Sequence, residues 1–219
     1  MGSILVIAPH ADDEVIGCGG MIAKRSGEHE IDIVIMAMGN NGIQYDVGNR
    51  IKEMEDAHKE LGVWAHKILF WGKSGYLDQV PMYDIVGALD RILDDGEYDE
   101  VYYPMPCHMH DHTIVYQACR AALRPGAHKM PRLVAEYEHN WPGWSSVEGG
   151  TMYVDISHGD CLVRKMAAMS QFQSQLNRHR VPHHPLSLDA IQRIASMRGL
   201  ECGVEYAERY RVTFLRYED

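Results

Sequence analysis

Residues 4–14 read Ile-Leu-Val-Ile-Ala-Pro-His-Ala-Asp-Asp-Glu, an unbroken aliphatic run that stops at a proline and gives way to a histidine and three acids. An apolar run without alternation is typical of a strand buried on both faces of a parallel sheet. Polar side chains directly after such a strand lie at the sheet edge where open α/β proteins bind ligands. The segment therefore predicts an α/β fold with a site at the end of its first strand.

Similar aliphatic runs alternate with helical patterns through the first 125 residues. Such alternation predicts βαβ units, that is, a parallel sheet covered by helices. No linker, repeat or change of composition divides the chain, so we expect one α/β domain over residues 1–219 with a mostly parallel central sheet. The expected strands are 4–8, 32–38, 67–71, 100–103, 133–138 and 152–156, and the expected helices are one beginning near 21, then 50–61, 82–93, 161–176 and 188–199.

The composition excludes several classes of protein. With 46% hydrophobic and 24% charged residues, the chain has the make-up of a soluble globular domain. A net charge of −10 argues against a nucleic-acid binder, which would carry a basic stripe for phosphates. No apolar run reaches the roughly 20 residues of a membrane span, and the N-terminus lacks the pattern of a signal peptide.

Five cysteines are scattered along the chain without a CxxC pair. An odd number of widely spaced cysteines predicts buried, reduced thiols, which suit a reducing compartment. We therefore expect a cytoplasmic protein. The cysteines are Cys18, Cys107, Cys119, Cys161 and Cys202.

Two clusters of possible metal ligands follow predicted strands, at residues 10–13 and 107–112. A catalytic zinc site takes about three protein ligands from His, Asp and Glu and keeps a position for water. The spacing of three places His10 and Asp13 on one side of the chain, and one histidine of the second cluster would complete the set. Either cluster alone is more often a solvated turn or helix N-terminus. Both clusters at one sheet edge favour a metal site.

Adjacent Asp12 and Asp13 would repel each other unless a cation offsets their charges. A bound zinc ion does so and lowers the pKa of its water to about 7. We therefore expect Asp13 on the metal and Asp12 beside the water as general base. The glycines at 17, 19 and 20 lack the pattern of a phosphate-binding loop and are expected to permit close packing of the first helix.

Taken together, these motifs resemble those of the LmbE-like, or PIG-L, zinc-dependent N-acetylglucosamine deacetylases. Residues 9–14 match that family's P-H-P-D-D-E motif, with Ala11 in place of a proline, and Asp111-His112 stands where the family has H-P-D-H. Further matches run along the rest of the chain: R-x-x-E-x-x-x-A with L-G at 50–62, D-I at 155–156, Lys165, S-Q at 174–175 and Y-A-E at 206–208.

The resemblance implies a Rossmann-like three-layer domain with zinc ligands His10, Asp13 and His112. It implies Asp12 as general base and Asp111 behind the ligands, orienting a ligand or the base. It also implies a small amino-sugar substrate and a homo-oligomer, a trimer or hexamer. The ligand set does not distinguish Zn²⁺ from Fe²⁺ or another divalent metal.

Arg50 matches the family position that contacts the sugar. The chain departs from the family at two other places. Asn40-Asn41 stands where similar proteins carry a Gly-Glu pair, and we expect Asn41 to contact the substrate. Met109 replaces a histidine that stabilises the oxyanion or protonates the leaving amine, and a thioether can do neither. We expect His110 or His108 to take over this role, the alternative being that neither does.

The function implied is removal of an N-acetyl or related N-acyl group from an N-acetylglucosamine-type conjugate. Two alternatives stay open: a metal-dependent amidase acting on a non-sugar substrate, and a non-catalytic zinc-binding protein. Two further features have competing interpretations. The loop with His179, His183 and His184 either lines the pocket mouth or is simply solvated, and Tyr137, Trp141 and Trp144 either form a platform for a sugar ring or pack in the core.

Overall fold

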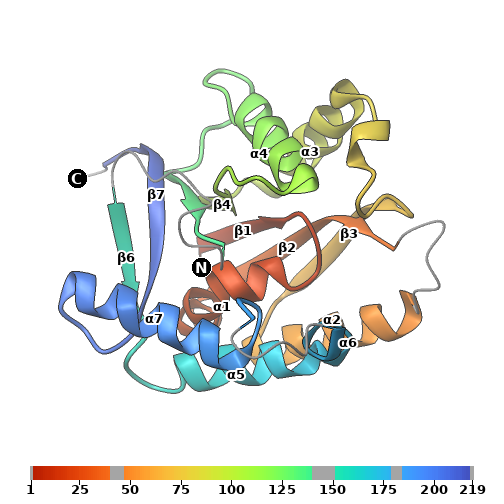
Figure 1. Cartoon of the computed structure of the whole chain (residues 1–219). Coiled ribbons are helices and arrows are strands. Elements are labelled where there is room, and N and C mark those ends of the chain that lie inside the picture. Colours follow the sequence, from red (N-terminus) through yellow and green to blue (C-terminus); the bar gives the residue numbers. More distant parts are fainter. Residues whose placement is uncertain (1, 40–46, 140–150, 179–183, 218–219) are drawn as a thin grey trace.

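The computed structural model describes residues 2–39, 47–139, 151–178 and 184–217 and is organised around one seven-stranded sheet (Figure 1). The strands are β1 (Gly2–Ala8), β2 (His29–Met38), β3 (Ala65–Trp71), β4 (Glu100–Pro104), β5 (Leu133–Tyr137), β6 (Thr151–Asp155) and β7 (Ala207–Leu215). They lie in the order β3-β2-β1-β4-β5-β7-β6. β1 to β5 pair in parallel, and β7 pairs antiparallel with both β5 and β6.

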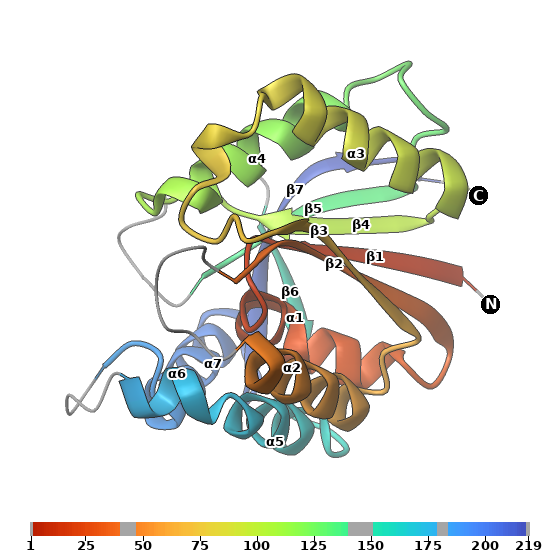
Figure 2. The ribbon, with the colours of Figure 1, turned by 90° about the vertical axis from the view of Figure 1, so that its right-hand side faces the viewer.

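Helices cover both faces of the sheet (Figure 2). They are α1 (Asp13–Arg25), α2 (Val47–Leu61), α3 (Met82–Gly96), α4 (His110–Ala122), α5 (Cys161–Gln171), α6 (Gln173–Arg178) and α7 (Leu188–Cys202), with a 3-10 turn η1 (Leu77–Gln79). α3 and α4 form one layer, and α1, α2, α5, α6 and α7 form the other. The prediction of a Rossmann-like three-layer α/β fold with a mostly parallel sheet is confirmed.

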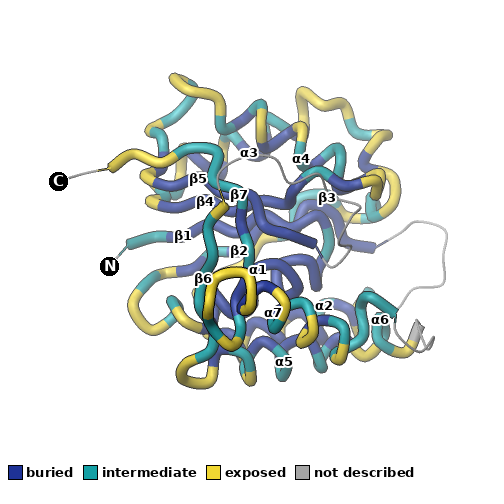
Figure 3. The backbone as a smooth tube through the Cα atoms, turned by 60° about the vertical axis from the view of Figure 1, so that its left-hand side comes forward, coloured by how far each residue is buried: buried dark blue, intermediate teal, exposed yellow. Residues whose placement is uncertain are grey.

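The first strand is buried on both faces, as its unbroken apolar run predicts. Ile4 and Val6 belong to the core under α1, α2 and α5, whereas Leu5 and Ile7 belong to the core under α3 and α4. All four side chains are fully buried. Figure 3 shows the same arrangement, with the central strands as the buried layer and the exposed segments on the outer loops and helices. Within the described residues, no helix is long and apolar enough to cross a membrane.

The strand order creates a switch point beside β1. The chain passes from β1 to its neighbour β2 on one side, while β4 pairs with the other side of β1, for example Val6 with Tyr102. Ligands of open α/β sheets bind outside the carboxyl ends of the strands at such a point. His10 follows β1, and α4 begins at His110 after β4, so both predicted clusters lie at this edge.

Several elements differ from the predictions. α1 begins at Asp13 rather than near residue 21, because its glycines pack closely and do not break the helix. α4 was not among the expected helices. The helix expected over 161–176 breaks at Phe172, whose backbone leaves helical geometry while its side chain is fully buried. The break also turns the backbone N and the Oγ of Ser174 toward the carboxylate of Glu53, at 2.7 and 2.6 Å. β7 was not predicted because buried Glu208 and the arginines at 209 and 211 interrupt its apolar pattern.

The glycines of α1 are required by close packing, as expected. A Cβ on Gly17 would overlap the ring of Tyr137, and a Cβ on Gly20 would lie 2.7 Å from the side chain of Ile156. Tyr137 is fully buried and donates a 2.9 Å hydrogen bond to the carbonyl of Ile7. Its ring therefore packs in the core and is no part of a sugar platform. Four of the five cysteines are buried free thiols, and Cys202 is exposed.

His128 fastens the segment after α4 to α3. Its Nδ1 lies 2.5 Å from Oδ1 of Asp94 and its Nε2 lies 2.9 Å from Oδ1 of Asp90. Both nitrogens can donate only in the imidazolium form. Burial lowers the pKa of His128, but the two carboxylates outweigh it and raise this pKa above its ordinary value.

A raised pKa makes the stabilisation by His128 depend on pH. The contribution is complete below the unfolded-state pKa of about 6.5 and is lost as the pH rises through the folded-state pKa. His128→Gln should therefore lower the melting temperature more at pH 6 than at pH 9.5, measured by thermal unfolding of both proteins in matched buffers. An equal decrease at the two pH values would show that the imidazolium form does not matter.

Candidate metal centre

His10 and Asp13 come from the turn that joins β1 to α1. The Oδ2 atom of Asp13 accepts a 2.9 Å hydrogen bond from the backbone N of His10 and lies 3.5 Å from His10 Nδ1. Asp13 is the first residue of α1, where the positive end of the helix dipole favours a carboxylate. The turn thus presents one imidazole and one carboxylate toward the same point.

His112, in the first turn of α4, brings the third donor. Its Nε2 lies 3.2 Å from Asp13 Oδ2, and its side chain is fully buried. Among the described residues, neither of its ring nitrogens makes a hydrogen bond of good geometry, so the contact with Asp13 is an ion pair only. A buried imidazole in that state costs free energy, which a metal ion on the ring would remove. Ligand atoms of His10, Asp13 and His112 all lie within 4.8 Å of one another, so the predicted ligands form a group that could hold a metal ion.

Asp111 lies behind His10. One of its oxygens, Oδ2, is 2.8 Å from His10 Nε2, and the same oxygen accepts a 2.6 Å hydrogen bond from the backbone N of Gly75. Oδ1 accepts from the backbone N of Leu77 at 3.3 Å. A carboxylate on the far nitrogen of a metal-ligating histidine fixes its orientation and raises its basicity. The role of Asp111 in orienting a ligand stays a prediction.

The backbone of Asp12 adopts an unusual conformation beside Asp13. Asp12 has φ 127° and ψ −28°, a strained conformation for a residue other than glycine. Its backbone N donates a 3.0 Å hydrogen bond to Oε2 of Glu14, whose other oxygen lies 3.1 Å from His58 Nε2. Buried Glu14 therefore holds the strained turn in place, a role that the sequence alone did not reveal.

Arg50 holds Asp12 from the opposite side. Its guanidinium lies 2.8 Å from Asp12 Oδ2 and also donates to the carbonyl of Ala11. The guanidinium stacks on the ring of Phe172, 4.7 Å from its centroid, as a cation–π pair. Only 4% of Arg50 is exposed. Arg50 therefore binds residues 11 and 12 of the segment that follows β1, and its contact with a sugar stays a prediction.

His139 is the residue of the site that sequence reasoning missed. Its Nε2 lies 2.9 Å from Asp13 Oδ1, the oxygen that does not face His10 and His112, and its ring packs edge-on against His112. It stands two residues after β5, at the same sheet edge as His10. A search of the carboxyl ends of all predicted strands would have found it, because the strand over 133–138 was expected.

Burial and neighbouring charges shift the pKa values of the groups in the centre. Burial alone would lower the pKa of His10, but Asp111 and Asp13 raise it to about 10. Burial would raise the pKa of Asp13, yet His112, His10 and His139 hold it well below its usual range. Burial raises the pKa of Asp12 in spite of the nearby Arg50. Such a site favours positive charge, which a divalent cation supplies.

Some predicted residues are not brought to the centre. The His110 side chain is 67% exposed and lies 3.8 Å from Asp78 Oδ2, and Met109 precedes α4 with 38% exposure. His184 accepts a 3.1 Å hydrogen bond from the backbone N of Leu186. Asn41, Trp141, Trp144, His179 and His183 lie outside the described residues.

Residues 5–123 match the PIG-L family, described as GlcNAc-PI de-N-acetylase. The chain belongs to the PIG-L family. It is also 31% identical over 128 residues to the uncharacterized deacetylase YaiS of Escherichia coli K12, an overlap that covers 55% of this chain and 68% of YaiS. The matched PIG-L region contains His10, Asp13 and His112 but ends before His139. The chain is therefore a member of a deacetylase family with a metal-binding site.

Solved structures share the fold over nearly the whole chain. The zinc inhibited form of teicoplanin deacetylase Orf2 has a TM-score of 0.80 at 17% identity, covering 96% of this chain and 97% of that one. N,N'-diacetylchitobiose deacetylase from Pyrococcus horikoshii has a TM-score of 0.70 at 24% identity, and the match covers 96% of this chain and 83% of that one. GalB, the 4-carboxy-2-hydroxymuconate hydratase from Pseudomonas putida KT2440, has a TM-score of 0.77 at 19% identity, and the match covers 100% of this chain and 99% of that one. These likenesses show the PIG-L fold and do not define a substrate.

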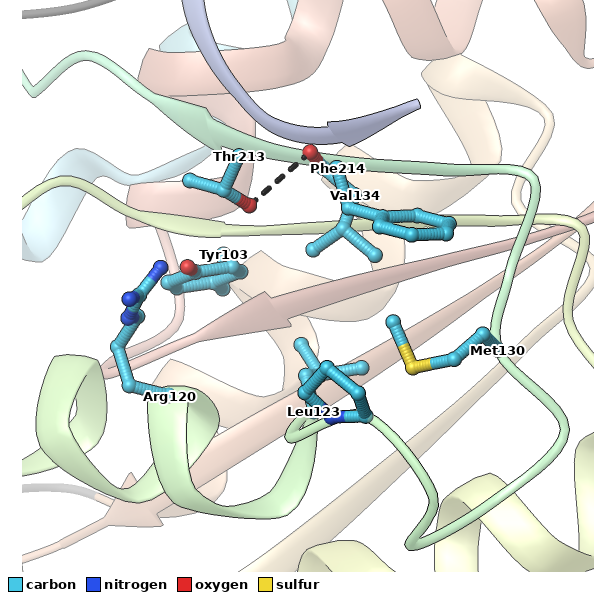
Figure 4. A pocket seen from close by; sticks show the side chains of 8 residues that line it. Tyr103, Arg120, Leu123, Met130, Val134, Thr213 and Phe214 are labelled. Atoms are coloured by element: carbon cyan, nitrogen blue, oxygen red, sulfur yellow. Dashed lines mark hydrogen bonds between the residues drawn. The ribbon is translucent and has the colours of Figure 1, made fainter. Parts of the chain in front are cut away.

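A cavity of about 190 Å³ lies apart from the metal centre, between α4 and the sheet (Figure 4). Arg120 stands at one side of it, and Thr213 Oγ1 donates a 3.2 Å hydrogen bond to the carbonyl of Val134. No residue of the metal centre lines it, so it takes no part in the chemistry at the centre. The lining residues are Tyr103, Arg120, Leu123, Pro125, Met130, Val134, Thr213 and Phe214.

Removal of one ligand is expected to abolish metal retention. His112→Ala should lose bound metal during dialysis while the protein stays folded, because two ligands remain where a catalytic site uses three. Metal content by inductively coupled plasma mass spectrometry checks this. His110→Ala is the matched control, since that exposed neighbour should leave the metal content unchanged. Full metal occupancy in His112→Ala would remove His112 from the ligand set.

Proposed function

We propose that this chain is a zinc-dependent N-deacetylase that hydrolyses the acetyl amide of an N-acetylglucosamine-type sugar conjugate. The observation that carries the proposal is a second carboxylate, Asp12, directly beside the metal donors but held by Arg50 rather than by the histidines. A site that only stores zinc needs no such carboxylate. Membership of the PIG-L family supports the reaction. The His/Asp/His donor set suits zinc, and the Orf2 structure is of a zinc inhibited form, which supports binding of zinc by a protein of this fold.

His10, Asp13 and His112 would hold the ion, which when bound polarises an amide carbonyl and lowers the pKa of a water molecule. Asp12 accepts the proton of the attacking water, and Arg50 at 2.8 Å fixes the direction of its carboxylate. The departing amine needs one proton, which Asp12 then carries. His110 stays a predicted second donor, although its imidazole lies beside Asp78.

The substrate class is the finer part of the proposal. The diacetylchitobiose deacetylase supports an acetylated amino sugar, and Arg50 and Asn41 are the predicted sugar contacts. GalB is a hydratase on the same fold, so the fold alone does not decide the reaction.

Acetate release tests the proposal directly. The zinc-loaded protein is incubated with N-acetylglucosamine, N,N'-diacetylchitobiose, an N-acetylglucosamine glycoside and an N-acetylated non-sugar amine. We expect acetate and free amine in equal amounts from at least one of the sugars. Acetate from the non-sugar amide alone would indicate a different amidase, and none from any of them at full metal occupancy would favour a non-catalytic protein.

We also propose a homo-oligomer, a trimer or hexamer, in the cytoplasm. β3 is an edge strand of the sheet, and the side chains of Trp64 and Trp71 at its ends are largely exposed, which supports an interface there. The buried free thiols support a reducing compartment. Light scattering of the purified protein measures the oligomeric state.

A further inference from the structure

The carboxylate of Asp13 is held on both of its oxygens. Oδ2 faces His112 Nε2 at 3.2 Å and His10 Nδ1 at 3.5 Å, so this oxygen is the one directed at the other two metal donors. Oδ1 has a different partner and lies 2.9 Å from His139 Nε2. Both Asp13 and His139 are buried. The two oxygens are thus distinguished by their partners before any ion is considered.

His139 is itself set by the C-terminal part of the chain. Its neighbour Glu138 is buried and pairs with Arg198 of α7, with Nε to Oε2 at 2.7 Å and Nη2 to Oε1 at 2.5 Å. Arg209 of β7 contacts the same carboxylate, and its carbonyl accepts from the backbone N of Glu138 at 3.4 Å. Elements far along the sequence therefore fix the position at which His139 enters the site.

We propose that His139 is a positioning residue for the metal, donating from Nε2 to Oδ1 of Asp13 and so keeping Oδ2 turned toward His10 and His112. The inference rests on the metal centre of the proposed function. It adds a residue beyond the matched 5–123 region to the support of that centre. Without the donor, Oδ1 would be buried without its histidine partner, and the carboxylate could rotate.

Partners of metal-ligating groups typically contribute about 10–100-fold to metal affinity. His139→Met fills the space with an apolar side chain of comparable reach but removes the donor, so we expect zinc to bind about 10–100-fold more weakly. His139→Gln places an amide NH₂ near the position of Nε2 and should recover most of the affinity. A residue that only fills space would show the reverse order or no difference between the two variants.

The experiment measures the zinc affinity of the full chain by competition with a chromophoric chelator. His128→Gln is the matched control, because it breaks a histidine–carboxylate contact far from the centre and should leave zinc affinity unchanged. Circular dichroism verifies folding; if His139→Met does not fold, His139→Asn, whose amide is too short to reach Oδ1, replaces it.

Zinc affinity of the donor-free variant within about twofold of the wild type, or His139→Gln binding as weakly as that variant, would overturn the inference. The measurement uses no substrate. A protein that binds zinc as described but releases no acetate would refute the proposed function and leave the role of His139 intact.

Discussion

Asp12→Asn is expected to retain zinc and to lose about 10²- to 10⁴-fold in kcat, the usual contribution of a positioned general base. The substitution keeps the size of the side chain, but an amide cannot take a proton from water at neutral pH. The metal donors are not altered, since His10, Asp13 and His112 do not include Asp12. Steady-state kinetics and metal analysis on the same preparation check both parts of the expectation.

A carboxylate remote from the centre serves as the control for this loss. Asp56→Asn, on α2, removes one acid that pairs with Lys52 and Lys59, and should leave kcat unchanged. If zinc-loaded Asp12→Asn turned over within a few-fold of the wild type, Asp12 would not be the base. A loss of zinc together with kcat would instead place Asp12 among the groups that hold the metal.

Lys165→Met is expected to reduce the free energy of unfolding by about 3–5 kcal/mol, the typical result of removing one partner from a buried ion pair. Lys165 Nζ lies 2.6 Å from Glu208 Oε1 and donates to the carbonyl of Ile16 at 2.7 Å. Both side chains are buried. The variant would leave the Glu208 charge without its cation and the Ile16 carbonyl without this donor, in the helix that carries Asp13.

Urea unfolding measures the change, and two further variants interpret it. Lys165→Met combined with Glu208→Gln should recover part of the loss, because the uncompensated charge is then gone. Lys52→Met, which removes a lysine from an exposed pair with Asp56, should have little effect. A Lys165→Met protein as stable as the wild type would show that the buried pair contributes no net stability.

The buried parallel strands could be predicted from the sequence, whereas two features of the C-terminal third could not. β1 and β2 were recognisable because burial on both faces leaves an unbroken apolar run. β7 was not, because its buried Glu208 is neutralised by Lys165 of α5, a partner that local pattern cannot reveal. At the break, Phe172 contacts the guanidinium of Arg50, a partner distant in sequence that local pattern cannot reveal.

The same distinction holds for the site. His10 and Asp13 share one turn, and their spacing alone brought them together. His112 was found through the likeness of its motif and its place after a strand. His139 follows a predicted strand, but no motif marks it and its contact with distant Asp13 appears only in the fold. The restraint of Asp12 by Arg50 was missed because it spans two elements.

The most direct test is acetate release from an N-acetylated sugar by one preparation whose metal is removed with a chelator and then restored with zinc. We expect acetate release to stop without metal and to return in proportion to the zinc bound, up to one ion per chain. Hydrolysis that continues at undetectable metal, or its absence from every acetyl amide at full zinc occupancy, would contradict the proposed zinc-dependent deacetylation.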